Sequence, residues 1–73
     1  MPIQLVSRVG CHLCEEAEQA LRAAGVSFQK LDVDADVELS RLYDFRVPVV
    51  LVNGRPVAEG RIGEPAVRRL VHL

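Results

Sequence analysis

The sequence carries no excess of charge of either sign and no long apolar run. Its 73 residues include 9 basic and 10 acidic side chains, which are interspersed and give a net charge of −1. A protein that binds nucleic acid usually presents a basic face to the phosphates, so nucleic acid is not an expected partner. No apolar stretch approaches the roughly 18 residues of a membrane span, and residues 1–10 lack the pattern of a secretion signal. We expect a cytoplasmic protein that binds neither nucleic acid nor membrane.

Repeats, low-complexity segments and a Pro/Gly-rich linker are also absent from the sequence. Apolar residues make up 49% of the chain and charged residues 26%, a balance typical of a folded globular protein and too apolar for a disordered one. A chain of this length lies near the lower limit for a single hydrophobic core. We therefore expect one domain over residues 1–73, and a monomer.

The pattern of apolar residues predicts alternating strands and helices. Short alternating or apolar runs predict strands, and apolar residues that recur every three or four positions predict helices. In chain order we expect a strand at residues 3–7, a helix at 11–24, a strand at 27–34, a helix at 37–45, two strands within 47–60 and a helix at 63–73. The order β-α-β-α-β-β-α implies a right-handed crossover between two parallel strands, followed by an antiparallel hairpin. The predicted fold class is α/β, with a mixed four-stranded sheet flanked by helices.

Turn and cap residues support these boundaries. Asp34 or Asp36 is placed to cap the second helix, because a carboxylate at that position accepts a backbone N–H of the first turn. The pair Asn53-Gly54 predicts a two-residue hairpin between the last two strands. Pro56 fits best in a strand at the edge of the sheet, since it has no N–H to donate to a neighbour.

The segment CHLC places Cys11 and Cys14 three residues apart, where the first strand gives way to the first helix. A C-x-x-C pair at the junction of a β-α-β pattern is typical of a dithiol/disulfide couple. Residues i and i+3 of a first helical turn are close enough to bond, and the unpaired N–H groups there favour a thiolate. We expect Cys11 at the exposed helix start as the nucleophile and Cys14 at the edge of the apolar face as the resolving thiol. His12 is either a residue that tunes these thiols or a solvent-facing side chain.

Three other interpretations of the cysteine pair stay open. A disulfide of purely structural role gains little from so short a loop, and the cytoplasm keeps thiols reduced. A structural zinc site needs four ligands, and only His12 and His72 add to the two cysteines, so no metal site is expected within one chain. A metal or iron–sulfur cluster completed by a second chain, or the docking of a partner without redox turnover, would instead make the domain a binding module. In the third interpretation, both cysteines are core residues without activity.

CHLC after the first strand, VPVVLVNG after the second helix and EGRIG before the last helix together resemble the thioredoxin-fold superfamily. The resemblance spans essentially the whole chain and is strongest to the short bacterial glutaredoxin-like proteins. It implies a minimal thioredoxin/glutaredoxin fold and a thiol–disulfide oxidoreductase that reduces protein disulfides or glutathione mixed disulfides. EGRIG is also similar to small redoxins that take electrons from thioredoxin reductase. The implied electron donor is therefore either glutathione or thioredoxin reductase.

The resemblance also implies further site residues. In this superfamily the proline before the third strand is cis and packs beside the cysteines, which assigns Pro48 to that position and gives Val47 the backbone groups that pair with an extended substrate. Arg8 lies where many glutaredoxins have a lysine, so it is a candidate to attract a glutathione carboxylate, and Gly60 matches a glycine of the glutathione site. The chain departs from glutaredoxins in the His-Leu of CHLC, in Arg46 before Val-Pro, and in EGRIGE in place of Gly-Gly-x-Asp. No tightly bound cofactor is expected, and glutathione is a possible co-substrate.

Overall fold

The computed structural model of the protein describes residues 2–71. In chain order its elements are β1 (Ile3–Ser7), α1 (His12–Ala23), β2 (Gln29–Asp32), the 3-10 helix η1 (Val33–Ala35), α2 (Val37–Tyr43), β3 (Val49–Val52), β4 (Arg55–Glu59) and α3 (Glu64–Val71). The predicted order β-α-β-α-β-β-α and the α/β fold class are confirmed, and η1 is an addition to that order. The predicted end of the last helix at residues 72–73 lies outside the described residues. No helix within residues 2–71 is both long and apolar enough to cross a membrane.

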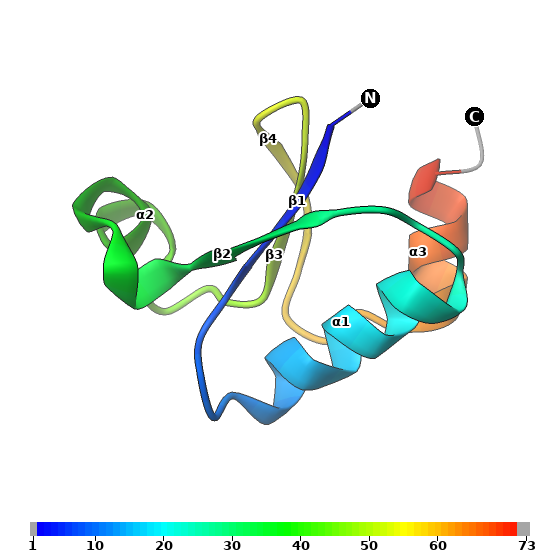
Figure 1. Ribbon diagram of the computed structural model, residues 1–73, viewed down its shortest axis with the longest axis horizontal. Helices are drawn as coiled ribbons and strands as arrows, with labels where there is room; N and C mark the ends of the chain where they lie inside the picture. The colour runs from blue at the N-terminus through cyan, green and yellow to red at the C-terminus, as the bar shows by residue number, and fades with distance from the viewer. Residues whose placement is uncertain (1, 72–73) are drawn as a thin grey trace.

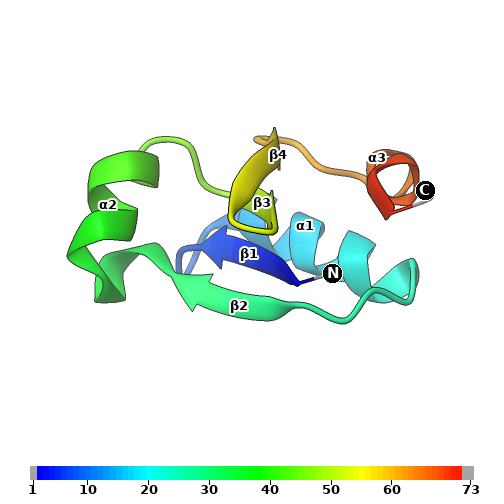
Figure 2. The same ribbon diagram turned by 90° about the horizontal axis from the view of Figure 1, so that it is seen from above.

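Within the described chain, four strands form one mixed sheet in the order β2-β1-β3-β4, which Figure 2 shows from above. β1 pairs parallel with β2 and antiparallel with β3, and β3 and β4 form an antiparallel hairpin. β1 therefore lies in the middle of the sheet, with one neighbour from each half of the chain. Figure 1 shows α1 and α3 together on one side of the sheet and α2 on the other.

Apolar side chains pack on both faces of this sheet. Because successive residues of a strand point to opposite faces, Leu5 faces α1 and α3 while Val6 faces η1 and α2. The buried cluster on the first face consists of Leu5, Ala17, Ala20, Leu21, Val50, Ile62 and Val67. The cluster on the second face consists of Val6, Val33, Tyr43, Val49 and Leu51. The β1–α1 connection, which leads to Cys11 and then to Cys14 in the first turn of α1, thus leaves a strand that is anchored on both faces.

The turns form largely as the sequence predicted. Asn53 and Gly54 have positive φ angles of 54° and 79°, the conformation of a two-residue hairpin turn of type I′. Pro56 lies in β4, which is an edge strand. Asp36 caps α2, since its carboxylate accepts the N–H of Leu39 at 3.0 Å.

The second strand is shorter than the predicted range 27–34, and its end corrects that prediction. The Asp32 carboxylate accepts the N–H of Asp34 at 2.9 Å, so the chain turns into η1 instead of continuing as β2. The alternation of apolar and polar residues continues past Asp32, the end of β2. Val33 follows it and is buried, although it lies in η1. A side-chain cap therefore overrides a strand pattern here.

Candidate active site

Cys11 lies at the N-cap of α1, with an extended backbone at φ −93° and ψ 114°. Its Sγ accepts a hydrogen bond from the backbone N–H of Cys14 at 3.2 Å. The first N–H groups of a helix have no partner within the helix, so the Cys14 N–H is free to donate to this sulfur. Cys11 is only partly buried, so a substrate sulfur has access to it.

Cys14, one turn into α1, is buried with 3% of its surface exposed. Both cysteines are free thiols in this structure. Burial, together with the nearby Cys11 sulfur, raises the pKa of Cys14 to about 11, and the backbone of Arg8 acts in the opposite direction. The two thiols are therefore unlike: Cys11 is accessible and bonded to an N–H donor, whereas Cys14 holds its proton at neutral pH.

The peptide bond between Val47 and Pro48 is cis, as the resemblance implied. Pro48 is buried, and its carbonyl accepts the N–H of Gly60 at 3.1 Å. Val49, the next residue, pairs with Val6 of β1, so Pro48 lies beside the start of the loop that leads to Cys11. Gly60 has φ 77°, a left-handed conformation that glycine adopts without a Cβ penalty. The sequence-predicted residues of the site thus come from three separate segments that the sheet brings to one end.

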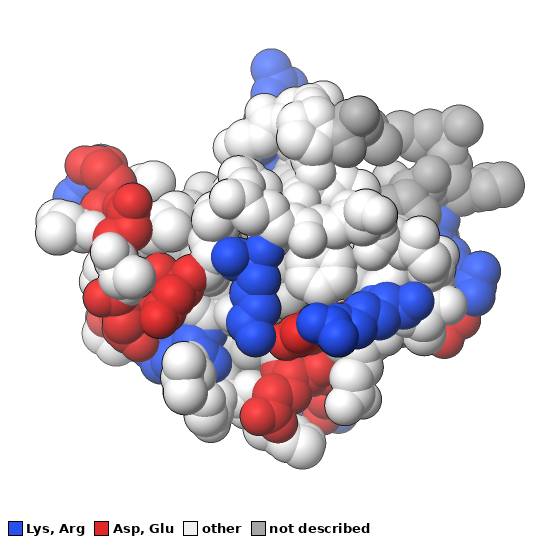
Figure 3. Space-filling view, viewed as in Figure 1, with Lys and Arg blue, Asp and Glu red and all other residues white. Residues whose placement is uncertain are grey.

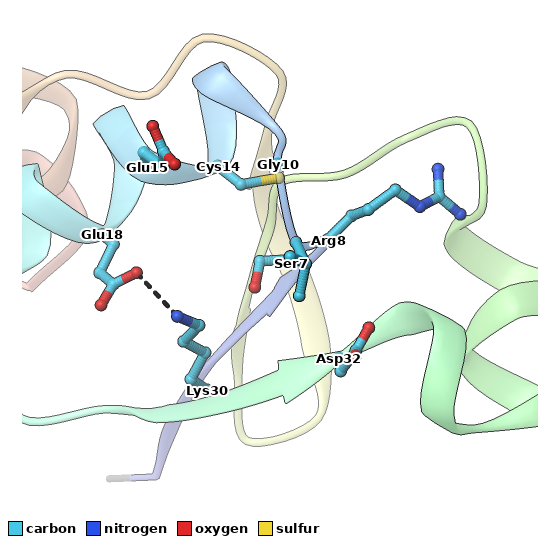
Figure 4. A pocket seen from close by; sticks show the side chains of 9 residues that line it. Ser7, Arg8, Gly10, Cys14, Glu15, Glu18, Lys30 and Asp32 are labelled. Atoms are coloured by element: carbon cyan, nitrogen blue, oxygen red, sulfur yellow. Dashed lines mark hydrogen bonds and ion pairs between the residues drawn. The ribbon is translucent and has the colours of Figure 1, made fainter.

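Arg8 follows β1 and points away from the sulfur of Cys14 (Figure 4). Its Nε and Nη2 donate to the two carboxylate oxygens of Asp34, each at 2.9 Å. Its Nη1 donates to the carbonyl of Asp44 at 3.1 Å, and its Nη2 also contacts the Asp44 carboxylate. This hydrogen bonding from Arg8 lowers the pKa of Asp34. Arg8 therefore ties the loop before Cys11 to η1 and to the end of α2, and its predicted contact with a glutathione carboxylate remains a prediction.

Arg46, just before Val47, is paired in a similar way. Its Nε donates to the Glu59 carboxylate at 2.8 Å, and its guanidinium carbon lies 5.2 Å from the centre of the Tyr43 ring. The pair lowers the pKa of Glu59. Both arginines that flank the cysteine site are thus compensated by carboxylates of the same chain, and the acidic partners were not identified from the sequence.

The surface around η1 and α2 is acidic. On the face shown in Figure 3, acidic side chains gather over the region of η1 and α2. Asp34 and Asp36, which belong to this stretch, are both exposed. An anion that approaches Arg8 from this side meets carboxylates first.

His12 lies in the first turn of α1 with its side chain 83% exposed. Its Nε2 is 3.0 Å from Glu16 Oε2, one turn further along the helix. The structure therefore places the imidazole on the solvent side of α1, paired with Glu16. Its predicted influence on the thiols remains a prediction.

A pocket of about 400 Å³ that the sequence did not predict opens beside Cys14 (Figure 4). It is lined by the end of β1 and the loop after it, by α1 and by β2. The lining residues are Ser7, Arg8, Val9, Gly10, Cys14, Glu15, Glu18, Lys30 and Asp32. Lys30 Nζ donates to Glu18 Oε1 at 3.1 Å. The sequence signal for this pocket is the i, i+4 spacing of Cys14 and Glu18, which places both on one side of the helix.

Metal ligation was one alternative reading of the cysteine pair. Among residues 2–71, no group of three or more His, Cys, Asp and Glu side chains is arranged to hold a metal ion. His72, the remaining candidate ligand, lies outside the described residues.

Comparisons with known proteins agree with this fold. The crystal structure of target protein XcR50 from X. campestris is 32% identical, with a TM-score of 0.84 over 96% of this chain and 95% of that one. The NrdH-redoxin of Escherichia coli, described as a glutaredoxin-like protein, shares the fold at 22% identity, with a TM-score of 0.78 over 100% of this chain and 97% of that one. The gene 56 protein of Mycobacterium phage L5 is 36% identical over 56 residues, which are 77% of this chain and 52% of that protein, so the match spans about half of the relative.

The sequence also matches a family directly. Residues 2–72 match the family described as Glutaredoxin-like domain (DUF836). That match, the thioredoxin-like fold and the Cys11–Cys14 pair support a redox role in general. Because the match covers nearly the whole chain, the protein belongs to the glutaredoxin-like domain family.

Proposed function

We propose that the protein is a thiol–disulfide oxidoreductase in which Cys11 is the nucleophile and Cys14 the resolving thiol. The observation that carries this proposal is the contrast between the two sulfurs. Cys11 Sγ is accessible and accepts the Cys14 N–H at 3.2 Å, whereas Cys14 is buried and one helical turn away. A thiolate at the first position and a protected thiol at the second are what sequential exchange requires.

The reaction has two exchange steps. The Cys11 thiolate attacks one sulfur of a substrate disulfide, and the other substrate sulfur leaves as a thiolate. Cys14 then loses its proton and attacks the Cys11 sulfur, which releases the second substrate thiolate and leaves a Cys11–Cys14 disulfide. Two electrons have passed to the substrate, and an external thiol donor must return them. Glutathione and thioredoxin reductase both remain candidate donors.

Substrate contact is proposed at the start of β3. An extended substrate segment would pair with the backbone of Val47, as in other cases of strand addition. Val47 is half-buried and precedes the buried Pro48. A segment paired with the Val47 backbone would therefore be held at a fixed distance from Pro48. Gly60 supports this arrangement indirectly, because its N–H is donated to the Pro48 carbonyl.

Protein disulfides fit this site better than glutathione does. Glutathione carries carboxylates, and the two arginines nearest the site already contact carboxylates of the chain. Arg8 in particular faces two of them, so an additional anion is repelled rather than attracted. A protein segment that binds through its backbone does not depend on these charges. We propose protein disulfides as the main substrates and glutathione as a weaker co-substrate, in the cytoplasm that the composition predicts.

Two serine variants test the mechanism. We expect Cys11→Ser to lose turnover of insulin disulfides completely, and Cys14→Ser to accumulate a mixed disulfide on Cys11 that mass spectrometry detects. Normal turnover by Cys11→Ser would rule out the proposed function.

A further inference from the structure

We propose that Arg8 is a positioning residue, which fixes the loop of the nucleophile Cys11 relative to the segment that carries Val47 and Pro48. This inference rests on the proposed function and adds to it how the opening for a substrate segment is held at one width. The resemblance to glutaredoxins implied a different role, the attraction of a glutathione carboxylate. In the structure the Arg8 side chain extends away from the sulfur of Cys14 (Figure 4), so its action on the site goes through the loops.

The main chain of Arg8 begins the turn that ends at Cys11. The N–H of Cys11 donates to the carbonyl of Arg8 at 3.2 Å. Gly10, the third residue of this turn, has φ 78°, as a type II turn requires. Arg8 directly follows β1, which lies in the middle of the sheet. Because a tight turn allows few backbone conformations, the position of Cys11 follows closely from that of Arg8.

The side chain of Arg8 is held by all three nitrogens of its guanidinium. Nε and Nη2 each donate to an oxygen of the Asp34 carboxylate in η1 at 2.9 Å. Nη1 donates to the main-chain carbonyl of Asp44 at 3.1 Å, and Nη2 also contacts the Asp44 carboxylate. Paired hydrogen bonds between a guanidinium and a carboxylate fix orientation as well as distance. Arg8 is thus fixed to two elements on the far side of the loop from the cysteines.

Asp44 connects this network to the proposed substrate segment. It is the C-cap of α2, and Pro48 follows it by only four positions. Within this short connection the N–H of Arg46 donates to the carbonyl of Tyr43 at 2.9 Å, so the chain turns directly from α2 toward the cis peptide bond. The contact between Arg8 and Asp44 therefore joins the loop of the nucleophile to the loop that offers its backbone to a substrate.

A lysine at position 8 separates positioning from charge. Lysine keeps the positive charge, but its single ammonium nitrogen does not reproduce the planar set of donors that joins Asp34 and Asp44. If Arg8 acted by attracting an anion or by stabilising the Cys11 thiolate, Arg8→Lys would retain its effect. If Arg8 acts by holding the two loops at a fixed spacing, Arg8→Lys loses that effect.

The test compares two disulfides that differ in whether they have a backbone to pair with Val47. All proteins carry Cys14→Ser, so that the adduct on Cys11 accumulates, and its rate of formation is read by mass spectrometry. With an extended peptide disulfide, we expect Arg8→Lys to react about tenfold to about a hundredfold more slowly, because a displacement of about 1 Å at the reacting atoms costs up to about 10²-fold. With hydroxyethyl disulfide, which has no peptide backbone, the rate should stay unchanged. Asp44→Ala should give the same pattern.

Two further variants are the controls. Arg41→Lys changes an arginine that pairs with Glu38 within α2, and both rates should stay as they are with Arg41. Asp36→Ala removes the cap of α2 and so lowers stability without touching Arg8, and it should leave the ratio of the two rates unchanged.

The outcomes separate the inference from the proposed function. Circular dichroism checks that each variant folds, and Asp44→Ala decides the question by itself where Arg8→Lys does not fold. Unchanged peptide rates in the folded variants would overturn the inference alone. Equal losses with both disulfides would also overturn it, since Arg8 would then act on the Cys11 sulfur. A protein with Arg8 intact that forms no adduct with either disulfide would overturn the proposed function itself.

Discussion

The backbone N–H of Cys14 donates a hydrogen bond to the Sγ of Cys11 at 3.2 Å. Residue 14 therefore contacts the proposed nucleophile through its main chain, whatever its side chain is. A hydrogen bond to a charged group contributes about 1.5–3 kcal/mol of net free energy. A difference of about 1.4 kcal/mol corresponds to a tenfold change in an equilibrium or rate constant. The reactivity of Cys11 should thus depend on the N–H at position 14 more than on the thiol there.

Cys14→Pro and Cys14→Ala form a matched pair for this contact. Both variants remove the thiol, but only the proline removes the N–H, and proline is tolerated in a first helical turn. We expect iodoacetamide to alkylate Cys11 at least about tenfold more slowly in Cys14→Pro than in Cys14→Ala, given the contribution of a charged hydrogen bond. Circular dichroism checks that both variants fold. Equal alkylation rates in the two folded variants would show that the N–H does not stabilise the thiolate.

Glu59→Gln should change substrate preference toward glutathione. The substitution removes the carboxylate that holds Arg46 at 2.8 Å and leaves a free guanidinium beside Val47. We expect kcat/KM for a glutathione mixed disulfide to rise about threefold to tenfold, in line with the small free energy of an exposed ion pair. Turnover of insulin should not change. Glu64→Gln, which breaks a comparable pair with Arg68 on α3, is the control, and an unchanged glutathione rate in Glu59→Gln would contradict the charge argument.

The Arg8–Asp34 pair should make stability depend on pH in the acid range. Arg8 lowers the pKa of Asp34 in the folded protein, so the folded state binds this proton less readily than the unfolded state. The stabilisation is fully present above the ordinary carboxyl range near pH 4 and is lost as the pH falls through the lower folded pKa. We expect Asp34→Asn to lose less stability than the wild type on acidification, measured by urea unfolding from about pH 5 to about pH 2. Parallel curves for the two proteins would contradict this assignment.

Gly60→Ala should destabilise the loop that supports Pro48. Gly60 has φ 77°, and nothing lies within 4 Å of an added Cβ, so the cost comes from backbone conformation alone. A left-handed conformation costs a non-glycine residue about 1–2 kcal/mol, and the free energy of unfolding should fall by that amount. Gly63→Ala is the matched control, because its Cβ would make an ordinary 3.7 Å contact with Pro65. Equal unfolding free energies for the two variants would contradict the claim that the backbone conformation at position 60 disfavours alanine.

Local sequence signals predicted most of the fold and the position of the two cysteines at the start of α1. The hairpin at Asn53-Gly54, the cap at Asp36 and the C-x-x-C at a helix start each depend on a few neighbouring residues, so they can be read from the sequence. The predicted end of the second strand was wrong because the side chain of Asp32 bonds the backbone and so competes with the strand pattern. That competition involves one hydrogen bond, which composition and alternation do not reveal.

Contacts between distant residues could not be predicted in this way. Arg8 meets Asp34 and Asp44, which are 26 and 36 positions away in the chain. Lys30 meets Glu18 from 12 positions away. These pairings depend on which strands become neighbours in the sheet. The residues next to an exposed charged side chain in the sequence do not indicate its partner. The sequence therefore indicated a candidate cysteine pair but not how the charges around it are compensated.

The most direct test of the central claim is the redox equilibrium of the purified protein in glutathione buffers, read by mass spectrometry. We expect a reversible loss of two hydrogens from Cys11 and Cys14, with a midpoint between about −180 and about −270 mV, the range of dithiol oxidoreductases. Because Arg8 and Arg46 already contact carboxylates of the chain, any glutathione adduct on Cys11 should be a minor species. Two thiols that stay reduced throughout this range, or that oxidise without reversal, would contradict the assignment of the pair as a working redox couple.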